Sequence, residues 1–175
     1  MQNTKKRLLG VVGLLFIFIL SACNNGVANE EVHDIKGMVR DYSIGSHNDV
    51  SASITSNELI VTDIENNKTT YSLPKDEFFV SIAPFVTTTH PCTNHSLTSC
   101  QGELVEKDFD VYIQDEDGNV VVDETMTSFE NGFIDLWLPR DQKFQVKIEY
   151  NGKVAKSEIS TYDGDNTCIT TMQLL

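Results

Sequence analysis

The sequence predicts a mostly β protein with a short N-terminal helix, in which a small α+β region is followed by an antiparallel β-sandwich. From residue 50 onward, short segments of alternating apolar and polar residues recur, with turn residues between them. The strongest hairpin signal is KFQVKIEY-NG-KVAKSEIS, because Asn151-Gly152 suits a two-residue type I′ turn. These observations favour short antiparallel strands over a helical or an alternating α/β fold.

The first 22 residues have the order of features found in a secretory leader. A basic stretch at residues 5–7 precedes a 13-residue apolar run, Leu8–Leu20. Such a run is too short, and wrongly flanked, for a stable membrane span. The sequence therefore predicts export from the cytoplasm.

The leader ends in LSAC, residues 20–23, which resembles the lipobox of bacterial lipoproteins. The resemblance implies that residues 1–22 are a lipoprotein signal peptide and that Cys23 is lipidated, which anchors the chain to the membrane. Residues 23–30 are small and polar and are predicted to form a tether. The alternative is an ordinary signal peptide cut near Ala22, which leaves Cys23 as a free thiol.

The chain is strongly acidic. Its 175 residues include 26 acidic and 13 basic residues, which gives a formal net charge of −13 at pH 7. The leader contains basic residues but no acidic ones, so its loss makes the net charge of the mature chain more negative still. Phosphate groups repel such a chain, so nucleic acid is not expected as a partner.

Residues 31–102 are predicted to form the N-terminal α+β region, which includes the cysteine segment. The segment EEVHDIKGMVRDY, residues 30–42, has apolar side chains at helical spacing and predicts a short amphipathic helix. Residues 50–73 alternate in three segments and predict a β meander. Asn66 and Asn67 lie in the linker ENNK and suit a turn with positive φ.

Residues 103–175 are predicted to form the antiparallel β-sandwich. The segments DFDVYIQD and VVVDE alternate on either side of the turn EDGN and predict a hairpin. The hairpin at Asn151-Gly152 follows, and TCITTMQLL is predicted to be a final strand. Short strands separated by turn residues at regular spacing are typical of a small sandwich.

Three cysteines remain if Cys23 carries lipid, and three is an odd number for an oxidising compartment. A Cys92–Cys100 disulfide is one interpretation, because the linker of seven residues can bring the two Cα atoms within about 4.4–6.8 Å of each other. That pairing leaves Cys168 unexplained. A soft-metal site is the other interpretation, and it uses all three thiols.

Thiolates are soft ligands, and Cu(I) accepts two or three of them, so copper as Cu(I) is the predicted metal. Zinc is the alternative, because His95 or His90 would complete a Cys₃His site, although the close cysteine pair common in structural zinc sites is missing. Met172 is a further secondary ligand candidate, since it shares a strand face with Cys168.

The thiols also allow redox chemistry. Oxidation of two thiolates to a disulfide releases two electrons, which can reduce two Cu(II) ions to Cu(I). Two other functions stay open: a thiol–disulfide oxidoreductase, although the chain has no C-x-x-C motif, and a structural β-sandwich lipoprotein whose cysteines only staple loops. A leftover thiol and exposed hairpins also allow a homodimer.

The segments HPCTNHSLTSCQGEL and DGDNTCITTMQL together resemble the CueP family of bacterial envelope copper-handling proteins, and the similarity spans about residues 41–175. The resemblance implies a mostly β fold and an extracytoplasmic protein for copper sequestration or resistance. Family members of the Gram-negative periplasm are soluble, whereas the lipobox of this chain predicts anchoring at a Gram-positive cell surface. The copper-associated cysteines implied by the resemblance are Cys92, Cys100 and Cys168.

Overall fold

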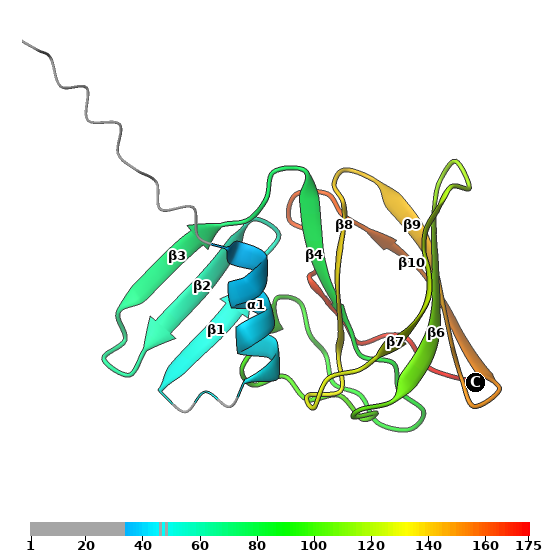
Figure 1. Ribbon diagram of the computed structural model, residues 1–175, viewed down its shortest axis with the longest axis horizontal. Helices are drawn as coiled ribbons and strands as arrows, with labels where there is room; N and C mark the ends of the chain where they lie inside the picture. Colours follow the sequence, from blue (N-terminus) through cyan, green and yellow to red (C-terminus); the bar gives the residue numbers. More distant parts are fainter. Residues whose placement is uncertain (1–33, 46, 48) are drawn as a thin grey trace, which may run out of the picture. The chain divides into compact units, whose positions relative to one another are not determined.

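Figure 1 shows the computed structural model, which describes residues 34–45, 47 and 49–175. The predicted signal peptide, the tether and the lipidation site at Cys23 lie outside the described residues. In the part that the structure describes, no helix is both long enough and apolar enough to cross a membrane.

The predicted fold class is confirmed, because the described chain has one short helix near its start and is otherwise built of strands in three sheets (Figure 1). In chain order the elements are α1 (Ile35–Ile44), β1 (Val50–Ile54), β2 (Glu58–Asp63), β3 (Lys68–Ser72), β4 (Glu77–Ile82), β5 (His95–Ser96), β6 (Asp108–Asp115), β7 (Val120–Thr127), β8 (Ile134–Pro139), β9 (Lys143–Tyr150), β10 (Lys153–Ser160) and β11 (Cys168–Ile169).

The helix α1 is the amphipathic helix that residues 30–42 predict. Asp34 caps it, and its side-chain carboxylate accepts a hydrogen bond of 3.0 Å from the backbone N–H of Gly37. This bond satisfies one of the backbone donors that a helix leaves free at its start. Val39 is buried and packs with Leu59 of β2 and Phe79 of β4, so the apolar face of the helix closes one part of the core.

The first sheet has the strand order β3-β2-β1-β5, and all its neighbours are antiparallel. The predicted meander is therefore confirmed, and Asn66 between β2 and β3 has the expected positive φ, 65°. The short strand β5 pairs with β1, with Ile54 opposite His95. The cysteine segment is thus tied to the edge of a sheet through β5.

The predicted β-sandwich is also confirmed. One of its sheets has the order β10-β9-β6-β7 and the other β11-β4-β8, and their apolar faces form the largest core cluster. Asn151 and Gly152 join β9 to β10 with φ values of 49° and 75°, as a type I′ turn requires. The core side chains that the two sheets and the segment after β11 contribute include Phe78, Val80, Ile82, Phe109, Ile113, Leu136, Phe144, Ile148 and Met172.

The last strand departs from an all-antiparallel sandwich. β11 is two residues long and pairs in parallel with β4, and an isolated parallel bridge between Phe85 and Gln173 follows. β4, which precedes the cysteine segment in the chain, therefore lies at the centre of a sheet with β8 and β11. The domain division between residues 102 and 103 stays a prediction, and this sheet includes strands from both sides of it.

The strand β4 presents two different faces. Phe78, Val80 and Ile82 belong to the core of the sandwich. The alternate residues belong to other clusters: Phe79 packs with the first sheet and α1, and Ala83, just after the strand, packs with Cys168. Because side chains alternate across a strand, one strand serves both the sandwich core and the cluster that holds the cysteines.

Candidate metal centre

Hydrogen bonds between distant segments bring the three cysteines together. Cys92 lies just before β5, Cys100 lies in the turn after it, and Cys168 begins β11. The backbone N–H of Cys168 donates to the carbonyl oxygen of Thr93 at 3.1 Å, which ties β11 to the loop that carries Cys92. The backbone N–H of Cys100 donates to Ser96 at 3.0 Å and folds the chain back after β5.

Thr167 connects the strands around the site, and no local sequence pattern marks it. Its side chain is fully buried, and its hydroxyl donates to the carbonyl oxygen of Ile54 at 2.7 Å. The same hydroxyl accepts a hydrogen bond of 3.0 Å from the backbone N–H of His95. The backbone carbonyl of Thr167 accepts from Ser81 N–H at 2.8 Å. One residue thus links β1, β5 and β4 to the strand that carries Cys168.

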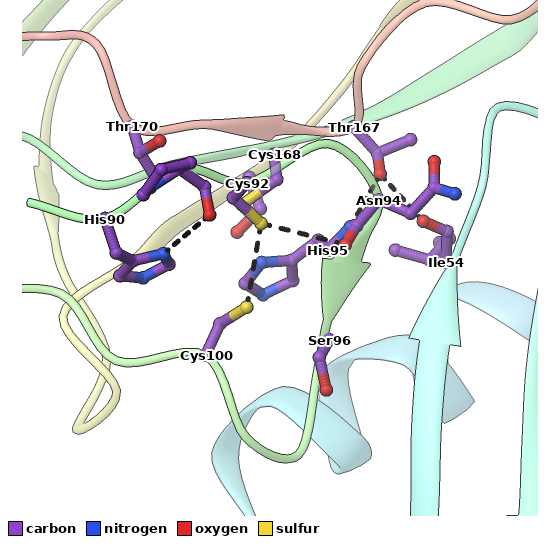
Figure 2. The surroundings of a disulfide bond; sticks show 12 residues. Ile54, His90, Cys92, Asn94, His95, Ser96, Cys100, Thr167, Cys168 and Thr170 are labelled. Atoms are coloured by element: carbon purple, nitrogen blue, oxygen red, sulfur yellow. Dashed lines mark hydrogen bonds between the residues drawn. A yellow bond between two sulfur atoms is a disulfide. The ribbon is translucent and has the colours of Figure 1, made fainter.

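The resulting cluster contains four potential metal ligands, each with one ligand atom within 4.8 Å of the others (Figure 2). They are Cys92, Cys100, Cys168 and one ring nitrogen of His95. Cys168 and His95 are buried, whereas Cys92 and Cys100 are half-buried, so the cluster opens to solvent on one side.

The two other predicted ligand candidates lie outside this cluster. The ring nitrogens of His90 each lie 3.2 Å from a backbone carbonyl oxygen, that of Pro91 on one side and that of Gln101 on the other. Met172 is buried in the core of the sandwich and belongs to a different apolar cluster from the one that contains Cys168. Its position matches the ordinary role of a methionine in a core.

His95 is the most unusual polar residue among those described. Its side chain is fully buried, and neither ring nitrogen has a hydrogen-bond partner in the described part of the chain. Its ring packs against Phe133, with the centroids 4.5 Å apart. Burial, and to a smaller extent the charge of His90, lowers the pKa of His95 to about 4. The ring is therefore neutral at physiological pH and has a nitrogen lone pair available for a metal ion.

The structure contains a Cys92–Cys168 disulfide, not the Cys92–Cys100 disulfide that was one interpretation of the sequence. The two residues are 76 positions apart in the chain, and their Cα atoms are 5.6 Å apart, within the usual range. The parallel pairing of β11 with β4 brings Cys168 to Cys92, and no local pattern encodes that pairing. Cys100 carries the free thiol, and its sulfur lies 3.7 Å from that of Cys92.

Apolar residues and a close backbone contact form the wall of the cluster. Cys168 packs with Ala83 and Phe133. Gly102 and Gly132 approach so closely that a Cβ atom on Gly102 would lie 2.6 Å from the carbonyl oxygen of Gly132. This contact holds the loop before Phe133 against the chain that follows Cys100. Glycine is needed at both positions because the two backbones leave no room for a Cβ atom.

A mostly β protein with three clustered sulfur atoms and a buried neutral imidazole belongs to the class of proteins with soft-metal or thiol-redox centres. The family described as "Periplasmic copper-binding protein CueP" matches residues 32–173. The chain belongs to this family, so the resemblance seen in the sequence is confirmed.

A solved structure described as "Crystal Structure of S.CueP" is similar to this chain. The two sequences are 39% identical, the match covers 83% of this chain and 92% of the other, and the TM-score is 0.77. No curated protein matches the chain at a significant level.

Proposed function

We propose that this protein binds copper as Cu(I) outside the cytoplasm, for copper sequestration or resistance, and that it reduces Cu(II) with its cysteine thiols. The observation that carries the proposal is the cluster of Cys92, Cys100, Cys168 and His95, whose ligand atoms lie within 4.8 Å of one another. Membership of a family described as periplasmic and copper-binding supports both the metal and the compartment.

The donor atoms favour copper in its reduced state. Thiolate sulfur and neutral imidazole nitrogen are soft or borderline ligands, and Cu(I) binds two or three of them without a fixed geometry. Three sulfurs and one nitrogen also match the Cys₃His set of structural zinc sites, so zinc is the alternative metal. Only the fully reduced protein offers zinc all three thiolates.

The redox step that we propose balances within the cluster. The thiolates of Cys92 and Cys168 lose one electron each and form their disulfide, and the two electrons reduce two Cu(II) ions to Cu(I). Cys100 keeps its thiol and, with His95, leaves a sulfur and a nitrogen ligand in the cluster. Because the ring of His95 is neutral well above pH 4, protons do not compete for that ligand at physiological pH.

We also propose that lipid at Cys23 anchors the protein at the outer side of the membrane. Palmitate labelling tests this anchor: the wild type is expected to incorporate label and Cys23→Ser is expected to lose it. Equal absence of label in both contradicts it.

A homodimer through the half-buried Cys100 is a further proposal, and gel filtration under oxidising and reducing conditions tests it.

Copper titration tests the main proposal. The fully reduced chain carrying Cys23→Ser is mixed with Cu(II) and a Cu(I)-specific chelator. We expect two Cu(I) ions for each disulfide formed and the loss of two thiols per chain. Cys92→Ser, which removes one sulfur of the proposed disulfide and leaves only Cys100 and Cys168, is expected to lose most of this reduction. Ser157→Ala on β10 is a control that is expected to keep it. Absence of both chelator colour and thiol loss contradicts the proposal.

A thiol–disulfide oxidoreductase is the second candidate, because a free thiol lies beside a disulfide. None of the three cysteines in the described part lies at a helix N-terminus, the position that commonly activates the thiol of such enzymes. Insulin reduction by the reduced chain in the absence of copper favours this candidate. Copper reduction without insulin reduction favours the main proposal, and the absence of both leaves a disulfide-stapled structural sandwich.

A further inference from the structure

The three sulfur atoms of the cluster differ in bonding and in exposure. Cys168 is bonded to Cys92 and is 2% exposed. Cys100 is half-buried and carries the free thiol. The sulfur of Cys92 has two sulfur neighbours, since it is bonded to Cys168 and lies 3.7 Å from Cys100 (Figure 2). Cys92 is therefore the sulfur that both other cysteines share.

We propose that the disulfide migrates, with Cys92 as the shared sulfur, between Cys92–Cys168 and Cys92–Cys100. The thiolate of Cys100 attacks the sulfur of Cys92, so a Cys92–Cys100 bond forms while the Cys92–Cys168 bond breaks. The electron pair of the broken bond leaves on the sulfur of Cys168. The proton of the Cys100 thiol goes to solvent, and the exchange consumes no oxidant or reductant.

The packing around each cysteine determines which thiolate attacks and which sulfur is the leaving group. The ligand atoms of the cluster are mutually close, so the three sulfurs form a compact group and not an extended line. Attack along the disulfide axis therefore requires the side chain of Cys100 to rotate about its χ1 angle. Cys100 is only partly buried where it packs against this cluster, so its side chain is the freer of the two to rotate, whereas Cys168 is buried in the cluster with Ala83 and Phe133. Cys100 is thus the attacking residue and Cys168 the leaving one.

Migration changes the environment of the free thiol. In the Cys92–Cys168 state the free thiol belongs to Cys100, which faces solvent in part. In the Cys92–Cys100 state it belongs to Cys168, which is buried in the same cluster as His95. A buried sulfur beside a buried neutral nitrogen is a soft ligand pair shielded from water. That consequence rests on the proposed copper function, but the exchange itself does not.

Locating the free thiol tests the exchange. The full chain carrying Cys23→Ser is oxidised until one thiol remains and is incubated at neutral pH. It is then quenched with acid, unfolded and alkylated with a maleimide at acidic pH, where exchange stops because the thiolate is lost. We expect peptide mass spectrometry to find the label on both Cys100 and Cys168, and none on Cys92. Label on Cys100 alone at every time point, or label on Cys92, overturns the proposal.

Single variants provide a second measurement. Cys168→Ser and Cys100→Ser each keep Cys92 with one partner, and both reduced variants are expected to form an intramolecular disulfide readily when oxidised with diamide. The matched control is Cys92→Ser, in which only Cys100 and Cys168 can pair. It is expected to oxidise at least about tenfold more slowly, a barrier higher by roughly 1.4 kcal/mol. Equally fast oxidation of Cys92→Ser overturns the role of Cys92.

Circular dichroism of each variant shows whether the fold is retained, so that a slow reaction is not mistaken for unfolding. None of these experiments contains copper. Failure of the exchange therefore leaves copper reduction standing, and failure of copper reduction leaves the exchange standing.

Discussion

Replacement of Thr167 by valine removes the hydroxyl that links the site to its scaffold while it keeps the shape of the side chain. The hydroxyl accepts from the backbone N–H of His95 at 3.0 Å and donates to the carbonyl oxygen of Ile54 at 2.7 Å. Thr167 is fully buried, so water cannot replace either bond without opening the fold. A buried backbone group that loses its partner costs about 1–3 kcal/mol.

The two lost bonds give an expected destabilisation of about 2–4 kcal/mol, because the carbonyl of Ile54 has a second lone pair and the valine methyl group recovers some apolar burial. For a domain of this size that corresponds to a fall in melting temperature of roughly 5–15 °C. Thr167→Ser is the matched control: it keeps the hydroxyl and loses one methyl group, at a cost of about 1 kcal/mol.

Urea unfolding of the oxidised chains, followed by circular dichroism, measures the free energies of unfolding. A Cu(I) competition assay on the reduced chains measures copper binding, which is expected to weaken in Thr167→Val because His95 and Cys168 lose their shared support. The reasoning is refuted if Thr167→Val matches the wild type within about 0.5 kcal/mol, or if Thr167→Ser is destabilised as much as Thr167→Val.

Three further predictions concern acid stability and backbone geometry. The pKa of His95 is lowered to about 4, so between about pH 6.5 and pH 4 the unfolded chain binds a proton that the folded chain does not. Stability of the metal-free protein should therefore fall as the pH falls through this window, by on the order of 3 kcal/mol, and unfolding curves that are flat with pH contradict this. Gly102→Ala places a Cβ atom 2.6 Å from the carbonyl oxygen of Gly132 and should destabilise by about 1–3 kcal/mol in thermal unfolding; an unchanged melting temperature shows that the loop yields freely. Gly152→Ala should cost about 1 kcal/mol in urea unfolding because Gly152 has φ 75°, and Gly118→Ala at φ 83° is a matched control expected to cost a similar amount.

The parts of the fold that the sequence predicted depend on local signals. The hairpin of β9 and β10 follows from alternation and from Asn151-Gly152, which together specify both the strands and the turn. The helix α1 follows from the helical spacing of apolar side chains in a short segment that begins at its capping residue, Asp34. Neither inference requires knowledge of which segments meet in space.

The parts that the sequence could not predict depend on one long-range contact. The parallel pairing of β11 with β4 joins segments far apart in the chain, and it brings Cys168 to Cys92. A two-residue strand carries too little pattern to reveal its partner or its direction. The same contact places the hydroxyl of Thr167 between two strands of the first sheet, so neither the disulfide partner nor this residue had a local signal.

His95 offers a test of whether the cluster exists for stability or for metal binding. Two buried ring nitrogens without partners in the described chain destabilise the metal-free fold, because each unsatisfied polar group costs about 1–3 kcal/mol. His95→Phe removes that cost and keeps a ring against Phe133, so the metal-free variant should be as stable as the wild type or more stable in urea unfolding. Its affinity for Cu(I) should fall at least about tenfold, which is roughly 1.4 kcal/mol. A variant with reduced stability and unchanged copper affinity would show that the imidazole serves packing alone. The expected pair of results, greater stability with weaker copper binding, identifies a residue whose burial is unfavourable until a metal ion supplies its missing partner.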